Sequence, residues 1–508
     1  MKKLVIFGID GVSPWLIKRL SSKGKIPNIQ RIINQGFFKP IESTIPCNTI
    51  PAWPCMVSGK TPGEINLFSL FSKKGYRKSL NSLDCHIPFW EQLDVKVGIM
   101  NVPGTYPAKP LNGFMMTSIL TPNNAPDFIF PEELKEELKE ELKEFTYVVG
   151  WNNKEELLAK SAKLTTIRFN ILKKLYQKHD LDLLFFVETV TDTLQHTMIQ
   201  YFDKSSPLYK KNRYEEKIYD YFELLDKLIG EFISNLPKDT TIIILSDHGM
   251  VSRFGQINLN KWLIDEGYLY FKNQKKLNLP SIFNKFRLTK DSVDKILKTL
   301  HLKKFLYRLL CGSGLGELLP DKGGITWSSA VEKDMVDFKK TKAFSAIGQG
   351  FIYLNGENEE LGIVKKEEHL NLRQEIIEKL KKLEIRDAKL VIKTKEEIYG
   401  GDYLKNAPDI MVYDKTFRYW PVTSISESKL MIPTDKNSLR PGDHHIEGIM
   451  ISNNPSLNHE NFQIYDIHKI IMNLFKDKRK DVSDKKHTVE SSGEKEVIKR
   501  LEALGYLT

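Results

Sequence analysis

Five short apolar runs constrain the fold of this chain more than any other feature of its sequence. They cover residues 4–9, 97–102, 182–187, 240–246 and 448–452, and they do not alternate with polar residues. This pattern is typical of a parallel sheet with helices on both faces, because each strand is then buried on both sides. Amphipathic segments at 158–179 and 215–236 lie between the runs. The alternation predicts an α/β fold, a doubly wound and mostly parallel sheet flanked by helices.

The remaining segments are predicted to be insertions and a tail. Residues 270–325 are rich in Lys and favour helix, and the Gly-rich 312–317 is no dinucleotide-binding fingerprint because no strand precedes it. We expect one catalytic domain over 1–475, with helical cap insertions at about 110–180 and 255–340. A polar linker and a short C-terminal helix should occupy 476–508.

Composition excludes several functional classes. With 41% hydrophobic residues, the chain can bury a large core without disulfides, and its four cysteines show no CxxC spacing. The net charge of +11 fits either attraction to phosphate or lysines on solvated helix faces, as in 133–145 where both signs mix. No basic stripe with interleaved aromatic residues occurs, so we predict no specific nucleic-acid partner.

Nothing in the sequence predicts a membrane segment. The apolar N-terminus is short and is interrupted by Asp10, unlike a signal peptide. No apolar run approaches the ~20 residues that span a bilayer. We therefore expect a soluble cytoplasmic protein without a membrane partner.

Carboxylates and imidazoles follow three of the apolar runs. Asp10 comes after the first run, Asp192 and His196 after the third, and Asp247 with His248 after the fourth. Ligand sites gather beyond the carboxyl ends of strands in open α/β sheets. Mixed Asp and His ligands suit Zn²⁺, with Mn²⁺ or Fe as alternatives.

Each of these residues also has a purely structural interpretation. An Asp after a strand is often a helix cap or a turn residue. The i, i+4 pair of Asp192 and His196 shares one helix face, which commonly gives a surface contact. In GDHHIEG (442–448), two adjacent histidines are either a solvent-exposed pair or include one ligand.

The segment STIPCNTIPAWPCMVSGKTPG (43–63) predicts a short helix with Thr49 at its start. Pro51 and Pro54 fit the first turn, and Gly59 would end the helix. A helix N-terminus attracts phosphate, and a metal ion nearby can activate a hydroxyl as a nucleophile. The structural alternative is that Thr49 is only an N-cap.

These pieces together resemble the alkaline phosphatase superfamily, and within it the type I phosphodiesterase/nucleotide pyrophosphatase family. The matching motifs are FGIDGV (7–12), IPNIQRIINQG (26–36), the Thr49 segment (43–63), VTDTLQH (190–196), SDHGM (246–250) and GDHHIEG (442–448). They occur in the family's order over most of the first 450 residues. The fold expected is therefore alkaline phosphatase-like.

The resemblance implies a division of ligands between two divalent metal ions. One ion would be held by Asp10, Thr49, Asp247 and His248, and the other by Asp192, His196 and His444. The spacing of the family motif selects His444 over His445. Thr49 would form a covalent intermediate that water then releases, which implies a small phosphate ester or nucleotide as substrate.

The sequence also departs from the family pattern. Nucleotide pyrophosphatases usually carry an Asn three residues after the Thr, where this chain has Ala52, so Asn48 is a candidate substitute in substrate binding. Ile65-Asn66 replaces a common His-Gly pair. A phosphotransferase or a phosphomonoesterase of the same superfamily stays open as an alternative, and so does a metal-binding protein without turnover. A sulfatase is disfavoured because the CxPxR context is missing.

Overall fold

The structure is a computed structural model that describes residues 3–74, 77–80, 86–122, 125–151, 153–272, 336–424, 429–436, 438 and 440–480. Its centre is one large sheet with the strand order β2-β19-β9-β1-β8-β5-β6-β7. The strands in that order are Phe37–Glu42, Glu447–Ser452, Thr241–Leu245, Leu4–Ile9, Leu183–Glu188, Val97–Met100, Gly113–Met116 and Ile129–Phe130. All five predicted apolar runs are strands of this sheet.

Most of the sheet is parallel, as predicted. Strand β1 runs parallel to β8 and β9, and β5 runs parallel to β8 and β6. The prediction was wrong for residues 448–452, because β19 is antiparallel to both β9 and β2. The chain reaches β19 from β18 (Gly442–His445) at the carboxyl edge of the sheet, so it must run back in the opposite direction. An apolar run carries no signal of strand direction.

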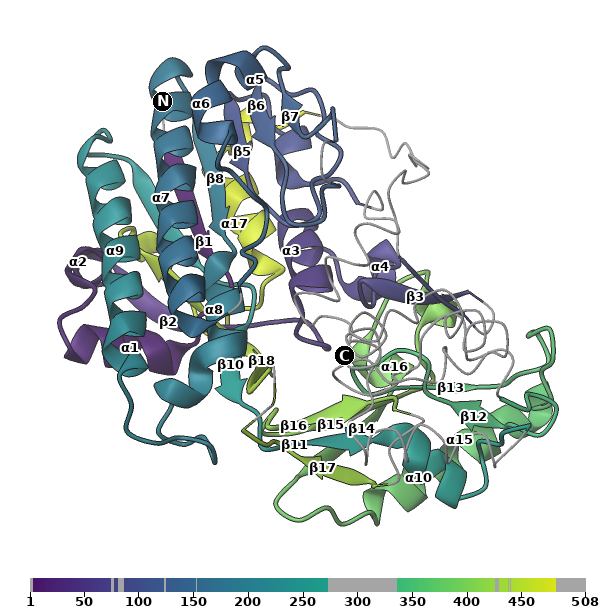
Figure 1. The fold of residues 1–508 in the computed structure, drawn as a ribbon. Helices are drawn as coiled ribbons and strands as arrows, with labels where there is room; N and C mark the ends of the chain where they lie inside the picture. Colours follow the sequence, from purple (N-terminus) through teal and green to yellow (C-terminus); the bar gives the residue numbers. More distant parts are fainter. Residues whose placement is uncertain are drawn as a thin grey trace, which may run out of the picture.

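Helices cover both faces of the sheet (Figure 1). Val5 and Phe7 of β1 belong to one apolar core with α1, α2, α7 and α9, whereas Ile6 belongs to another with α3 and α17. The bounds of these helices are Pro14–Ser22, Pro27–Gln35, Lys154–Lys178, Tyr214–Ser234, Thr49–Ser58 and Asp466–Leu474. Neighbouring residues of one strand therefore face opposite layers, which explains why the runs are apolar throughout.

The segment 110–180 is part of these layers rather than a cap over them. Strands β6 and β7 extend the edge of the main sheet, and α7 packs against α9 on its face. The short helices α5 (Leu134–Glu137) and α6 (Lys139–Leu142) lie between them in the chain. Strands of four and two residues are too short to produce a periodic signal in the sequence.

Between β10 (Gly249–Ser252) and β18, the chain forms two smaller sheets below the main one (Figure 1). One has the order β12-β13-β15-β14, and the other has the order β16-β11-β17. Their bounds are Ala343–Phe344, Phe351–Leu354, Ile410–Asp414 and Leu390–Thr394, then Tyr419–Val422, Gly255–Asn258 and Met431–Pro433. Helices α10 (Leu259–Asp265), α15 (Lys366–Lys381) and α16 (Lys395–Ile398) accompany them.

Several predictions concern residues outside the described ranges. Most of the predicted cap at 255–340 falls there, since residues 273–335 are not described. The same holds for the predicted C-terminal helix and nearly all of the linker, because the description ends at residue 480. Across the described part of the chain, no helix is both long and apolar enough to cross a membrane.

Candidate metal centre

Thr49 is the first residue of α3, and its hydroxyl faces the carboxyl edge of the main sheet. The helix ends at Gly59, whose φ of 67° is the left-handed conformation expected after a helix. Asn48 precedes the helix, and its carbonyl accepts a hydrogen bond from the N–H of Ala52 at 2.9 Å. Thr49 Oγ1 lies 3.3 Å from His248 Nε2. Ile50 is not helical (φ −114°, ψ 112°), so the regular helix begins at Pro51 and the Thr49 hydroxyl lies just before its first turn.

One cluster of candidate ligands contains Asp10, Asp247 and His248, all buried. Asp10 directly follows β1, and the other two follow β9 after Ser246, so adjacent parallel strands place them close together. His248 Nε2 lies 3.6 Å from Asp10 Oδ1 and 3.3 Å from Asp247 Oδ2. Trp53 of α3 donates from Nε1 to Asp10 Oδ2 at 3.3 Å, which fixes the orientation of that carboxylate.

The second cluster contains Asp192, His196 and His444, which are also buried. The first two lie one turn apart on α8 (Val190–Met198), directly after β8. His444 comes from β18, and its Nε2 lies 2.8 Å from His196 Nε2 and 3.5 Å from Asp192 Oδ1. His445 turns the other way and lies against Phe417, with ring centroids 5.3 Å apart. The rings of His248 and His444 are 4.0 Å apart, so the two clusters adjoin.

Each of the three clustered histidines has an oxygen atom beside its Nδ1. His196 Nδ1 lies 2.9 Å from the Gly442 carbonyl, and His248 Nδ1 lies 3.0 Å from the Gly249 carbonyl. His444 Nδ1 lies 2.6 Å from Asn48 Oδ1. Since these oxygens can only accept, each Nδ1 carries the proton, which leaves a lone pair on each Nε2. The Nε2 lone pairs of His248 and His444 face the clusters, whereas that of His196 lies 2.6 Å from Arg440 Nη2. Metal-binding histidines are usually oriented in this way.

The charges of the clusters are unbalanced without a cation. Burial and the neighbouring carboxylates Asp247 and Asp192 raise the pKa of Asp10 well above its usual value. Burial also raises the pKa of Asp247, and it lowers the pKa of His248 and brings that of His444 to about 4. The histidines are therefore neutral at neutral pH, as metal binding requires.

The donor set fits divalent cations. Among the described residues, Asp10 Oδ1 and Asp247 Oδ2 are buried and accept no hydrogen bond, an arrangement that costs free energy unless a cation neutralises them. Within each cluster the ligand atoms lie within 4.8 Å of one another. Two buried groups of carboxylate and imidazole atoms are thus preformed, and Thr49 adjoins the first.

Sequence reasoning missed a buried arginine at the second cluster. Arg440 Nη2 lies 2.6 Å from His196 Nε2, and Arg440 is also 3.9 Å from the carboxylate of Asp443. Asp443 pairs in addition with Arg253. Burial lowers the pKa of His196, and the positive charge of Arg440 lowers it further. Its place four residues before His444, in LRPGDHH, was the available signal.

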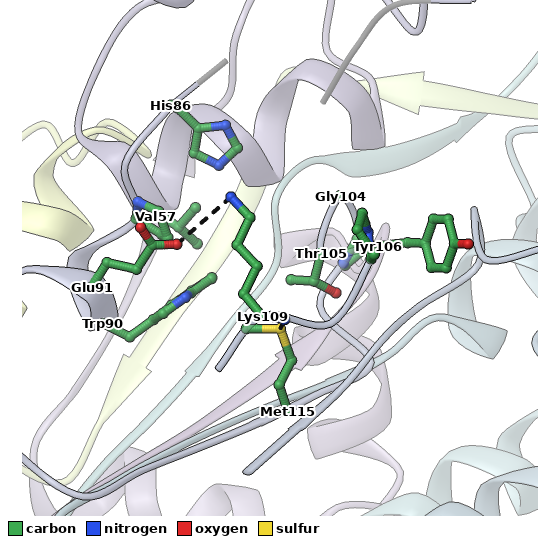
Figure 2. Close-up of a pocket in the computed structure, with 12 residues that line it drawn as sticks. Val57, His86, Trp90, Glu91, Gly104, Thr105, Tyr106, Lys109 and Met115 are labelled. Atoms are coloured by element: carbon green, nitrogen blue, oxygen red, sulfur yellow. Dashed lines mark hydrogen bonds and ion pairs between the residues drawn. The ribbon is translucent and has the colours of Figure 1, made fainter. Parts of the chain in front are cut away.

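A further pocket lies beside the C-terminal part of α3 (Figure 2). Val57 of α3 and Met115 of β6 line it, together with Trp90 and the loop after β5. Lys109 and Glu91 face one another across it, with Nζ and Oε1 3.9 Å apart. None of the residues that line this pocket belongs to either ligand cluster. This pocket is therefore separate from the two ligand clusters.

Comparison with known proteins gives one sequence match of high coverage. The profile described as type I phosphodiesterase / nucleotide pyrophosphatase matches residues 4–446, a range that includes all the clustered residues. Among curated proteins, none matches this sequence closely enough to count as a relative.

Solved structures with a similar fold include phosphonoacetate hydrolase from Sinorhizobium meliloti 1021. Its complex with phosphonoformate has a TM-score of 0.56 at 13% identity, and the match covers 93% of this chain and 95% of that one. Its complex with phosphonoacetate gives 0.55 with the same identity and coverage. Human ectonucleotide pyrophosphatase / phosphodiesterase 5 matches over 94% of this chain and 95% of its own, at 13% identity and a TM-score of 0.47. The main sheet and its helices are thus alkaline phosphatase-like.

Proposed function

The chain belongs to the type I phosphodiesterase/nucleotide pyrophosphatase family and is a phosphoester hydrolase, and within that class we propose that it cleaves phosphodiesters through a covalent intermediate on Thr49. The observation that carries the proposal is the position of the Thr49 hydroxyl, at a helix N-terminus and 3.3 Å from His248 Nε2 in the first ligand cluster. A helix N-terminus stabilises an anionic phosphoryl group.

We propose that Asp10, Asp247 and His248 bind one divalent cation together with Thr49, and that Asp192, His196 and His444 bind another. Zn²⁺ is the proposed ion, since imidazole and carboxylate ligands suit it, with Mn²⁺ and Fe as alternatives. Two such ions would lower the pKa of a hydroxyl nucleophile and neutralise charge on the phosphoryl oxygens.

The reaction divides into two displacements at phosphorus. Thr49 Oγ1 loses its proton to solvent and forms a bond to phosphorus, while the bond from phosphorus to the departing alcohol oxygen breaks. Water then attacks the same phosphorus from the vacated side, the bond to Thr49 breaks, and the hydroxyl is regenerated. Each displacement inverts phosphorus, so the overall reaction retains configuration.

Asn48 is proposed to hold the substrate. Its Oδ1 lies 2.6 Å from His444 Nδ1, so the amide group is fixed with its NH₂ directed elsewhere. Asn48 Nδ2 is buried and donates to none of the described residues. A phosphoryl oxygen beside Thr49 would accept a hydrogen bond from Asn48 Nδ2. In family members with an Asn three residues after the Thr, that Asn would make the corresponding hydrogen bond.

The test compares Thr49→Val, which removes only the hydroxyl, with Thr49→Ser, which keeps it. With Zn²⁺ or Mn²⁺ and bis(p-nitrophenyl) phosphate, we expect Thr49→Val to lose at least about 10³-fold in kcat while binding two metal ions by elemental analysis. Thr49→Ser should keep measurable turnover. Full activity in Thr49→Val would refute the nucleophile, and two-metal Thr49→Ser protein without turnover on any ester would favour the non-catalytic alternative.

Substrate class is tested on the wild-type holoenzyme with p-nitrophenyl phosphate, bis(p-nitrophenyl) phosphate and a nucleotide p-nitrophenyl ester. We expect the diesters to have the higher kcat/KM. A preference for the monoester would instead indicate a phosphomonoesterase. Transfer of the phosphoryl group to an added alcohol in preference to water would indicate a phosphotransferase.

A further inference from the structure

A small pocket lies where the nucleophile segment meets the smaller sheets. Its lining includes residues 45–47, Gln349 and the aromatic residues Tyr413, Phe417, Tyr419 and Trp420. Its volume is about 20 Å³. A water molecule needs roughly 10–15 Å³ of such space, so the pocket admits a methyl group or the edge of a ring.

The lining of the pocket is mainly apolar, but it includes two side chains with acceptor atoms, Gln349 and Asp414. Asp414 also lines it, but its carboxylate already accepts hydrogen bonds from the backbone N–H groups of Lys389 at 2.8 Å and Arg418 at 3.1 Å. Gln349 Oε1, by contrast, is buried and accepts no hydrogen bond from the described residues. A group that fits this pocket is therefore uncharged and mainly apolar, with one O–H or N–H that donates to Gln349 Oε1.

The pocket shares walls with the candidate metal centre. Trp420 lines it and also meets His444 edge-on, with ring centroids 6.1 Å apart and planes at 86°. Cys47 lines it and lies two residues before Thr49, a separation of at most about 7 Å along the chain. The pocket therefore lies within one side chain of the candidate metal centre.

The geometry of the displacement at phosphorus indicates which substituent of a substrate would enter the pocket. Thr49 lies on the Asp10, Asp247 and His248 cluster, and an in-line displacement places the departing oxygen on the side opposite the nucleophile. Trp420, which lines the pocket, borders His444 of the second cluster. A departing oxygen on the side of that cluster would therefore bring its substituent nearest to the pocket.

We propose that this pocket is a leaving-group subsite that selects phosphodiesters of apolar, preferably hydroxylated aryl or alkyl alcohols. The inference rests on the proposed function, since it assumes that Thr49 attacks phosphorus. The smaller sheets, which supply Gln349 and Trp420, are then the part of the fold that chooses the substrate.

The test measures binding of two phosphonates to the Zn²⁺-loaded protein by isothermal titration calorimetry. Methylphosphonate and benzylphosphonate share the phosphonate group, and neither can be hydrolysed by the proposed reaction, so the ratio of their Kd values reports the substituent alone. We expect benzylphosphonate to bind about tenfold more tightly, as expected for roughly 50–60 Å² of apolar surface buried. In Trp420→Ala the ratio should fall to about one, and Trp420→Phe should restore most of it. Because the ratio is taken within each variant, changes in the metal centre itself cancel.

The pocket of Figure 2 supplies the matched control, because Tyr106→Ala removes an aromatic side chain there. The ratio should stay at about ten in Tyr106→Ala, and a fall there with none in Trp420→Ala would overturn the assignment. For the buried acceptor, 4-hydroxybenzylphosphonate should lose its advantage over benzylphosphonate in Gln349→Leu. Tight methylphosphonate binding with a wild-type ratio of one would refute the subsite alone. No phosphonate binding together with no diester hydrolysis would refute the proposed function instead.

Discussion

The ion pair between Arg168 and Glu188 offers a quantitative test of what holds the ligand-bearing turn. Both side chains have no solvent exposure. Arg168 also donates to the Tyr147 carbonyl at 3.0 Å and to Thr189 Oγ1 at 3.2 Å, and Glu188 Oε1 accepts from the N–H of Val190 at 3.0 Å. The pair thus joins α7 to the end of β8, directly before α8.

Arg168→Met leaves the Glu188 carboxylate buried with only one backbone donor. Removing one partner of a buried pair costs about 3–5 kcal/mol of unfolding free energy, whereas replacing both by apolar residues of similar size is often nearly neutral. We therefore expect Arg168→Met to lose about 3–5 kcal/mol. The double variant with Glu188→Met should recover at least about 2 kcal/mol of that loss.

The assay is urea unfolding of the metal-free wild type, both single variants and the double variant, followed by circular dichroism. The coupling free energy is read from the cycle of four proteins. The Glu188 carbonyl also accepts from the N–H of Asp10 at 3.1 Å, so Zn²⁺ affinity should fall about 10–100-fold in Arg168→Met and rise again in the double variant. Additive losses, or a single-variant loss below about 1 kcal/mol, would refute this account of the pair.

Two further predictions concern the first ligand cluster. In chelated protein, the raised pKa of Asp247 means that the folded state holds this proton more tightly than the unfolded state, so its contribution to stability falls as pH rises above about 4. At pH 7 without metal, Asp247→Asn should therefore be more stable than the wild type, by about 1.4 kcal/mol per unit of pKa shift. With Zn²⁺ bound, it should be less stable than the wild type. Thermal unfolding of both proteins at pH 4 and 7, with and without Zn²⁺, measures these differences. Gly8→Ala would place its Cβ 2.6 Å from the Trp53 ring, so we expect the free energy of unfolding to fall by about 1–3 kcal/mol. Because Trp53 orients Asp10, Zn²⁺ binding should also weaken. An unchanged Zn²⁺ affinity in titration calorimetry would show that Trp53 has no such role.

The parts of the fold that sequence predicted are those encoded locally. Each apolar run predicts a strand buried on both faces, and the residues just after a strand lie at the edge of the sheet. The positions of Asp10, Asp247 and His248 could therefore be predicted from the sequence alone. His444 needed the resemblance to the family, since nothing local separates it from His445. The metal-binding roles of all of these residues stay predictions.

What sequence could not predict depends on contacts between distant segments. The direction of β19 follows from where the chain arrives, and the smaller sheets use strands of two to five residues that are too short for a clear period. Trp420 reaches His444 only because β16 pairs with β11 beside the main sheet. The sequence places Arg440 four residues before His444, but it does not predict that Arg440 contacts His196. That contact depends on how β18 packs against α8.

The connection from β18 into β19 also sets an order of events during synthesis. The first ligand cluster is complete once residue 248 has been made, whereas the second awaits His444, roughly 200 residues and 10–40 s of translation later. Throughout that interval the outer edge of β9 has no partner from β19, and an uncovered strand edge invites pairing with other chains. His444 and the strand that covers this edge emerge from the ribosome together. A nascent chain long enough to complete the second cluster is therefore also one that is about to complete the strand that covers this sheet edge.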